Sequence, residues 1–108
     1  MSENGWDSVP PFHIVVDADA EPPCVMVTGE IDLATCAAFR DALAEAIEVA
    51  RRGIVVDARG VTFMGSVGIR ELVRALQAVE RIEVRAPQPI VRRALETASV
   101  GNGLVVVD

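Results

Sequence analysis

The sequence predicts a single α/β domain with a mainly parallel sheet of five strands, an N-terminal antiparallel hairpin and three or four packed helices. Short apolar segments alternate with longer segments of helical periodicity, which is typical of strands joined by crossover helices. Residues 54–56 are continuously apolar, as in strands of parallel sheets that helices cover on both faces. The chain has 108 residues, 51% of them hydrophobic, which is enough for one core and too few for a second domain.

The first segments predict a tail and a hairpin. Residues 1–11 are polar and end in two prolines, so we expect a flexible N-terminal tail, followed by the domain at 12–108. Apolar and polar residues alternate over 12–17, which predicts an edge strand. Two further prolines form a turn, and residues 24–28 predict a second strand that is antiparallel to the first and ends at Gly29.

The next segment predicts the first helix. Thr35 is a candidate N-cap, because its hydroxyl can accept a hydrogen bond from a backbone N–H one turn later. Gly53 is a natural C-terminal stop, and it follows two arginines that suit the negative end of a helix. An apolar stripe at helical spacing is expected to face the sheet: Cys36, Phe39, Leu43, Ile47 and Ala50.

The central segment predicts a buried strand, a connecting loop and a second helix. We expect Asp57 to end the strand at 54–56 and Gly60 to supply a turn in the loop. Ser66 is a good N-cap residue for the helix. The helix has an apolar stripe of Ile69, Leu72, Val73, Leu76 and Val79, and an expected solvent face of Arg70, Glu71, Arg74 and Gln77.

The last segment predicts a strand, a helix and a closing strand. Residues 82–85 alternate in polarity, and two prolines then interrupt the chain. Pro89 suits the first turn of a third helix, whose expected buried stripe is Ile90, Val91, Ala94, Leu95 and Ala98. Residues 104–107 are continuously apolar and predict a final buried strand.

Open α/β sheets carry their functional loops at the carboxyl ends of the parallel strands. One polar cluster is expected at this edge, formed by Glu30, Asp32, Asp57 and Ser66. For Asp32 and Asp57 we favour a structural role, in which the carboxylate accepts backbone N–H bonds of the following turn. Catalysis is not expected, because the chain has no lysine, no histidine near Ser66 and no GxxxxGK loop. We therefore predict no enzyme activity, cofactor or metal.

The two cysteines are too few for a disulfide framework and lack the spacing of a metal site. We expect Cys24 and Cys36 to be buried free thiols, with a redox switch as the alternative. The single histidine, His13, falls on the outer face of the predicted edge strand, which is typical of a solvated side chain.

The formal net charge of −6 argues against direct binding of nucleic acid, because neutralising phosphates requires a basic face. The sequence has no apolar run of bilayer length, so we expect no membrane insertion. The N-terminus has no basic region followed by an apolar core, so we expect no signal peptide and a cytoplasmic location.

Three stretches of the sequence resemble the STAS domains, and within them the bacterial anti-sigma factor antagonists: VTGEIDLAT, IVVDARGVTFMGSVGI and APQPIVRRALETASVG. In that family the loop at 64–68 usually reads apolar, Asp, Ser, Ser or Thr, Gly, and the second hydroxyl accepts a phosphate from the partner kinase. This chain departs from the pattern. Gly65 replaces the Asp, Ser66 matches the first hydroxyl, and Val67 occupies the acceptor position.

The resemblance implies a protein that binds an anti-sigma factor of the histidine-kinase-like ATPase type and so releases a sigma factor. It implies a flat partner surface on the loop and the following helix, formed with one residue of an earlier loop: Asp32, Gly65, Ser66, Val67, Gly68, Ile69, Arg70 and Arg74. Ser66 is the remaining candidate phosphoacceptor, although we favour capping alone. We expect a monomer or weak dimer. The alternatives are a non-switching scaffold subunit of a signalling or transport complex, and a small enzyme or nucleotide binder.

Overall fold

The computed structural model describes residues 11–98 and 100–108, so the predicted tail lies outside the described residues except for Pro11. Within them the chain forms five strands and three helices. Their order and bounds are β1 (His13–Asp17), β2 (Cys24–Ile31), α1 (Cys36–Val49), β3 (Ile54–Met64), α2 (Ser66–Ala75), β4 (Ile82–Arg85), α3 (Pro89–Ala98) and β5 (Leu104–Val107). None of these helices has the length and apolar character needed to cross a bilayer.

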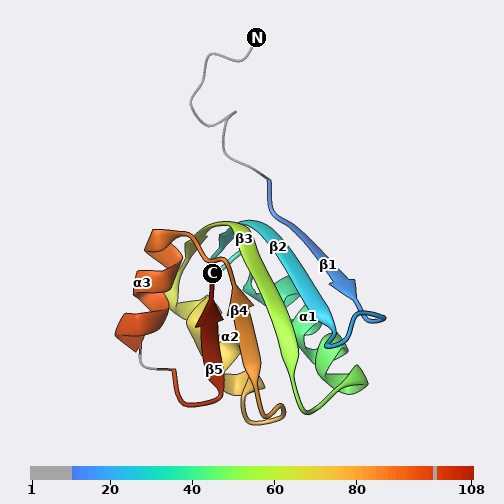
Figure 1. Cartoon of the computed structure of the whole chain (residues 1–108). Coiled ribbons are helices and arrows are strands. Elements are labelled where there is room, and N and C mark those ends of the chain that lie inside the picture. The colour runs from blue at the N-terminus through green and yellow to red at the C-terminus, as the bar shows by residue number, and fades with distance from the viewer. Residues whose placement is uncertain (1–10, 99) are drawn as a thin grey trace.

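The five strands form one sheet in the order β1-β2-β3-β4-β5 (Figure 1). The strand β1 is antiparallel to β2, and the other three pairings are parallel. This arrangement confirms the predicted fold class, including the antiparallel hairpin at the start. The β4 strand has the predicted bounds, and so does β5.

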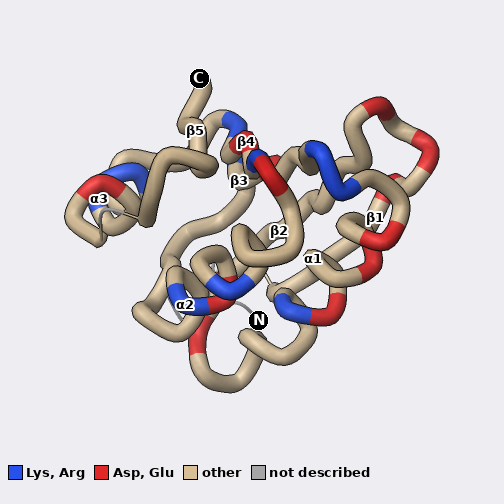
Figure 2. The backbone as a smooth tube through the Cα atoms, turned by 90° about the horizontal axis from the view of Figure 1, so that it is seen from below, with Lys and Arg blue, Asp and Glu red and all other residues tan. Residues whose placement is uncertain are grey.

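All three helices lie on the same side of the sheet (Figures 1 and 2). The expectation that helices cover both faces is therefore wrong. The helix-covered face carries the core, which includes Val25, Phe39, Val56, Leu72, Val84 and Leu95. On the open face Val55 is still buried, because β3 is the central strand and places Val55 between Cys24 of β2 and Glu83 of β4. Residues 54–56 are therefore continuously apolar because β3 is the central strand of the sheet, although helices cover only one of its faces.

The strands β2 and β3 are longer than predicted. Asp57 does not end β3 and Gly60 does not turn the chain, since both lie within the strand. Gly29 does not end β2 either. Two register shifts between β2 and β3 allow the pairing to continue, and Gly29 adopts a φ of 91° at the second shift. Bulges of this kind bend a strand without ending it.

The helix α1 buries the expected stripe from Phe39 to Ile47, although Cys36 is only half-buried. Thr35 occupies the predicted N-cap position, but the expected hydrogen bond from its side chain to the helix is not formed. The Thr35 hydroxyl instead donates to the Glu30 carbonyl at 2.9 Å. The helix ends at Val49, before the predicted stop at Gly53.

The exposed and buried faces of α2 and α3 differ from the prediction at four positions. Glu71 was expected in solvent but is only 7% exposed, whereas Val73 is 41% exposed. Ile90 and Ala98 were expected in the core, but Ile90 is 56% exposed and Ala98 is exposed as well. Glu71 is buried because α2 packs against α1 as well as the sheet, so its buried surface is wider than one stripe. In α3 the buried residues are Val91 and Leu95.

The strand β5 is half-buried along its whole length, whereas the sequence predicted a fully buried strand. It lies at an edge of the sheet and has only β4 as a neighbour. The loop between β4 and α3 is held to this edge, because the Ala86 N–H donates to the Val107 carbonyl at 2.7 Å. Ala86 has a φ of 54°, a left-handed conformation that alanine rarely adopts.

Candidate partner-binding site

The chain turns sharply at the carboxyl end of β3. We call Gly65, Ser66, Val67 and Gly68 the knuckle. It follows Met64, the last residue of β3, and includes the first three residues of α2. The knuckle therefore lies at the edge of the sheet where parallel strands present their loops, as the sequence predicts.

Two contacts hold the knuckle against the end of β2. The Gly65 N–H donates to the Ile31 carbonyl at 2.9 Å. Gly68 is buried, and a Cβ atom added there would lie 2.8 Å from Ile31 Cγ2 and 2.9 Å from Met64 Cγ. Gly68 therefore acts by allowing α2 to approach the sheet closely, and it offers little surface to a partner.

The N-cap of α2 is Gly65, so the prediction that Ser66 caps this helix is wrong. The Gly65 carbonyl accepts the first helical bonds, from the N–H groups of Gly68 at 3.0 Å and Ile69 at 3.3 Å. Ser66 already has a helical position one residue later, where its hydroxyl makes no cap bond. Glycine is an acceptable N-cap because it reaches the extended conformation that this position needs, here φ −78° and ψ 173°.

The predicted partner-binding residues on α2 form a continuous outer surface. Ser66 and Arg70 are exposed, while Val67 and Ile69 are half-buried. The Arg74 side chain is 58% exposed, and its guanidinium lies 3.9 Å from Glu71 Oε1. Glu71 itself is buried, so only the Arg74 side of this pair faces solvent, and the outer N–H groups of its guanidinium are available to a partner.

Asp32 lies beside the knuckle, because it directly follows Ile31, the residue that accepts the bond from Gly65. Its carboxylate accepts N–H bonds from Ala34 at 3.0 Å and Thr35 at 3.2 Å. The geometry confirms the structural role that the sequence favoured for Asp32. A carboxylate that is occupied in this way shapes the loop before α1 and has less capacity left for a partner.

The expected polar cluster is only partly formed. Glu30 and Asp32 lie at the sheet edge, but Asp57 lies seven residues before Met64 in the same strand, roughly 20 Å away at 3.3 Å per residue. The Asp57 carboxylate accepts the Arg59 N–H at 3.1 Å, as the structural interpretation predicted. Within the described part of the chain, no group of three or more His, Cys, Asp or Glu side chains could hold a metal ion.

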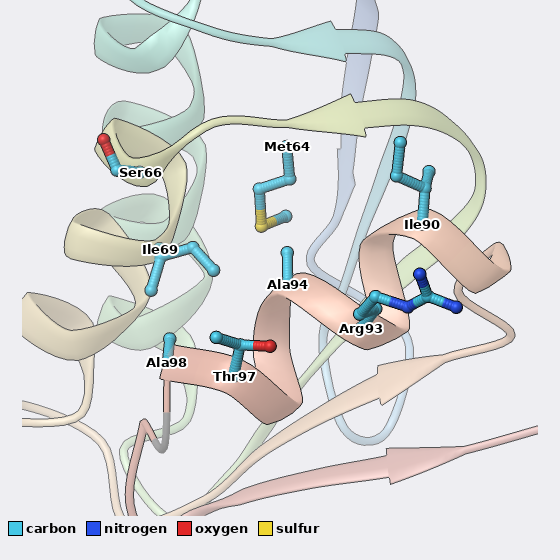
Figure 3. A pocket seen from close by; sticks show the side chains of 8 residues that line it. All are labelled: Met64, Ser66, Ile69, Ile90, Arg93, Ala94, Thr97 and Ala98. Atoms are coloured by element: carbon cyan, nitrogen blue, oxygen red, sulfur yellow. The ribbon is translucent and has the colours of Figure 1, made fainter.

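A groove of about 430 Å³ lies between the start of α2 and α3, so the expected flat surface is wrong on this side of the knuckle (Figure 3). Its lining comes from the end of β3 and both helices: Met64, Ser66, Ile69, Ile90, Arg93, Ala94, Thr97 and Ala98. Met64 and Ile69 point towards Ala94, whereas the Ser66 hydroxyl points away from the centre (Figure 3). Sequence reasoning missed this groove, because it assigned Ile90, Ala94 and Ala98 to the core.

Charge is unevenly distributed over the domain (Figure 2). Acidic residues concentrate in β1 and the turn after it, which carry Asp17, Asp19 and Glu21. The helices α2 and α3, on the other side, carry basic and acidic residues together, with two arginines and one glutamate in each (Figure 2). The helix surface next to the knuckle is therefore less acidic than the net charge of −6 suggests.

The thiols and the histidine do not contribute to the knuckle. Cys24 begins β2 at the other end of the sheet, where burial raises the pKa of its thiol and the Asp57 carboxylate raises it further. Both cysteines are free, as predicted, but they are half-buried, whereas the sequence predicted them to be buried. His13 is exposed on β1, which confirms its predicted position.

The fold and the knuckle define a single-domain α/β protein with a loop-and-helix surface. A family model described as "Mlab, STAS domain" matches residues 14–107. The chain belongs to this STAS domain family, as its resemblance in three sequence stretches predicted. No curated protein sequence matches the chain significantly.

Two solved structures that resemble the chain are anti-sigma factor antagonists. One comes from Mycobacterium paratuberculosis, with 25% sequence identity, a TM-score of 0.78, and coverage of 90% of this chain and 86% of the other. The second is SpoIIAA in its unphosphorylated form, with 19% identity, a TM-score of 0.73 and coverage of 89% of both chains. The second similarity supports the fold alone.

Proposed function

We propose that this protein is an anti-sigma factor antagonist that binds an anti-sigma factor through the knuckle and the exposed face of α2. Binding occupies the surface of the anti-sigma factor that held a sigma factor, and the sigma factor is released. The partner in this proposal is an anti-sigma factor of the histidine-kinase-like ATPase type. The protein contributes a shaped surface and no catalytic group.

One observation carries this proposal: the knuckle is exposed at Ser66 and fixed at Gly65 and Gly68, in a chain that shares its fold and 25% identity with an anti-sigma factor antagonist. A fixed surface loses little conformational entropy when it binds a partner, which favours affinity. The exposed Arg70 and Arg74 extend this surface by one further turn of α2.

We further propose that phosphorylation does not switch this antagonist off. Val67 stands where the family resemblance places the phosphate-accepting hydroxyl, and valine cannot accept a phosphate. The hydroxyl of Ser66 points away from the groove (Figure 3), one residue from the expected acceptor position. The amount of the protein, or a signal other than the kinase, then controls partner binding.

The test uses the purified protein and the anti-sigma factors of its source cell, measured by isothermal titration calorimetry. We expect saturable one-to-one binding to an anti-sigma factor of the ATPase type. If none of them binds, and the protein instead co-purifies stably with a membrane or signalling complex, the scaffold alternative replaces this proposal.

The second part of the test is incubation with that anti-sigma factor and ATP, followed by intact mass measurement. We expect no phosphate on the natural protein and one phosphate on the Val67→Ser variant, which restores the expected acceptor hydroxyl. A stoichiometric phosphate on Ser66 of the natural protein would show that the regulatory part of the proposal is wrong.

A further inference from the structure

We infer that the groove between α2 and α3 receives an apolar side chain of the bound protein and that Arg93 pairs with a carboxylate next to that side chain. This inference rests on the proposed function and extends it, because it assigns α3 to the interface and states the chemistry of the partner. The sequence resemblance placed the partner surface on Asp32, the knuckle and α2, and did not include α3.

The shape of the groove fits one or two apolar side chains. Met64 is buried and forms the floor at the end of β3, and Ile69 and Ala94 face each other across the groove (Figure 3). The volume of about 430 Å³ is mostly bounded by carbon atoms of these residues and of Ala98. Small residues on α3 keep the groove open, since a larger side chain at Ala94 would fill it.

Ile90 extends the apolar surface of the groove. It is 56% exposed on the first turn of α3, although it directly precedes Val91, which is completely buried. Single exposed apolar residues are common on protein surfaces, but one that borders an apolar groove enlarges a continuous patch. Apolar patches with a polar rim are typical of sites that another protein covers.

The charge at the rim favours an acidic neighbour on the partner. Arg93 is exposed and lines the groove, and within the described residues no carboxylate lies within ion-pair distance of it. The adjacent Arg92 differs, since it forms an ion pair with Asp108. Glu96 lines a hollow on another side of α3. Arg93 is therefore available to a carboxylate that approaches the groove.

The groove is continuous with the proposed interface. Ser66 of the knuckle and Ile69 of α2 both line it, and Arg70 follows Ile69 directly. One partner element, such as an amphipathic helix, can therefore contact the knuckle and the groove together. A protein suits this open groove better than a small molecule, because small-molecule sites usually enclose most of their ligand.

The experiment compares four variants in the calorimetric titration with the anti-sigma factor. Ala94→Trp fills the groove, and Arg93→Glu reverses the charge at its rim. The matched controls lie at the opposite end of the domain: Val49→Trp introduces the same side chain at a residue that is 55% exposed, and Arg52→Glu makes the same charge change. Circular dichroism and thermal melting verify that each variant is folded.

We expect Ala94→Trp to weaken binding about tenfold or more, because buried apolar anchors dominate interface energies. Arg93→Glu should weaken binding severalfold, with a larger effect at low salt. Both controls should bind like the natural protein. If the natural protein binds and the two groove variants bind equally well, the groove inference is wrong and the proposed function stands.

Absence of any binding by the natural protein would instead contradict the proposed function.

Titration with laurate tests whether the groove binds a lipid chain instead of a side chain of a protein. If laurate binds saturably, and Ala94→Trp abolishes that binding while the affinity for the anti-sigma factor stays unchanged, the groove is a site for an acyl chain and the inference is overturned. Failure of laurate to bind, together with weaker binding of both groove variants to the anti-sigma factor, supports the inference.

Discussion

Gly68 lies so close to Ile31 that a Cβ atom at position 68 would be 2.8 Å from Ile31 Cγ2. The first turn of α2 therefore rests directly on the end of β2. Together with the bond from the Gly65 N–H to the Ile31 carbonyl, this contact fixes the orientation of the knuckle. The proposed function depends on that orientation, so a change at Gly68 should affect both stability and binding.

The Gly68→Ala variant tests this contact. The added methyl group overpacks the junction, which costs roughly 1–3 kcal/mol, and the better helix propensity of alanine offsets about 1 kcal/mol at most. We expect the free energy of unfolding to fall by about 1–2 kcal/mol in urea denaturation. Arg70→Ala, an exposed position on the same helix, should change it by less than about 0.5 kcal/mol. A Gly68→Ala protein as stable as the natural one would contradict the close contact.

Gly60 and Thr28 form a second tight contact, between β3 and β2. A Cβ atom at Gly60 would lie 2.5 Å from Thr28 Cγ2, so Gly60→Ala should destabilise the protein by roughly 1–3 kcal/mol. Thr28→Ser removes that methyl group and should recover part of the loss. In a double-mutant cycle of unfolding free energies we expect a coupling of about 1 kcal/mol. If the effects of the two substitutions on the unfolding free energy are additive, the two residues do not contact each other.

Glu71 is buried on α2, and its Oε1 atom accepts no hydrogen bond among the described residues, although the Arg74 guanidinium lies 3.9 Å from it. A buried carboxylate oxygen without a hydrogen bond costs about 1–3 kcal/mol, and a long ion pair with the largely exposed Arg74 offsets only part of this cost. Glu71→Met should therefore raise the free energy of unfolding by about 1 kcal/mol, because methionine has a similar shape and needs no partner. Glu48→Met on the exposed side of α1 is the control and should have little effect. A marked loss of stability in Glu71→Met would show that the ion pair with Arg74 stabilises the fold by more than the missing hydrogen bond costs.

Cys24 should react slowly with thiol reagents, since burial and then Asp57 raise the pKa of its thiol. In a Cys36→Ser background, iodoacetamide should modify Cys24 faster after Asp57→Asn, because loss of the negative charge lowers the thiol pKa. The asparagine oxygen can still accept the Arg59 N–H bond. The proton on Cys24 stabilises the fold fully below the ordinary thiol pKa, and this contribution is lost as the pH rises through the folded pKa. An unchanged rate in the Asp57→Asn variant would contradict the influence of this carboxylate.

The sequence predicted most elements correctly because their signals are local. Proline and glycine mark the turns, and the apolar spacing of α1 or β4 identifies each element from its own residues. The length of β3 was not predictable in this way. Asp57 and Gly60 are typical of turns, but bulged pairing with β2 keeps them in the strand.

The surface of the site was harder to predict than its position. The loop at 64–68 follows from the family resemblance, and the fold places it at the expected edge of the sheet. The burial of Glu71 depends on how α1 packs against α2, and the exposure of Ile90 depends on how α3 is rotated about its axis. Periodicity alone does not determine these tertiary relationships. The sequence did contain one signal of a second apolar surface, because α3 has two adjacent apolar stripes, one through Ile90 and one through Val91.

The central claim is that the knuckle displaces a sigma factor from its anti-sigma factor. The most direct measurement is release of a fluorescently labelled sigma factor from the preformed complex, followed by anisotropy as this protein is added. We expect the anisotropy to fall to that of the free sigma factor with the natural protein, and to fall far less with Arg70→Glu, whereas Arg52→Glu should act like the natural protein. An anisotropy that stays at the value of the complex at saturating concentrations of the natural protein would contradict the account.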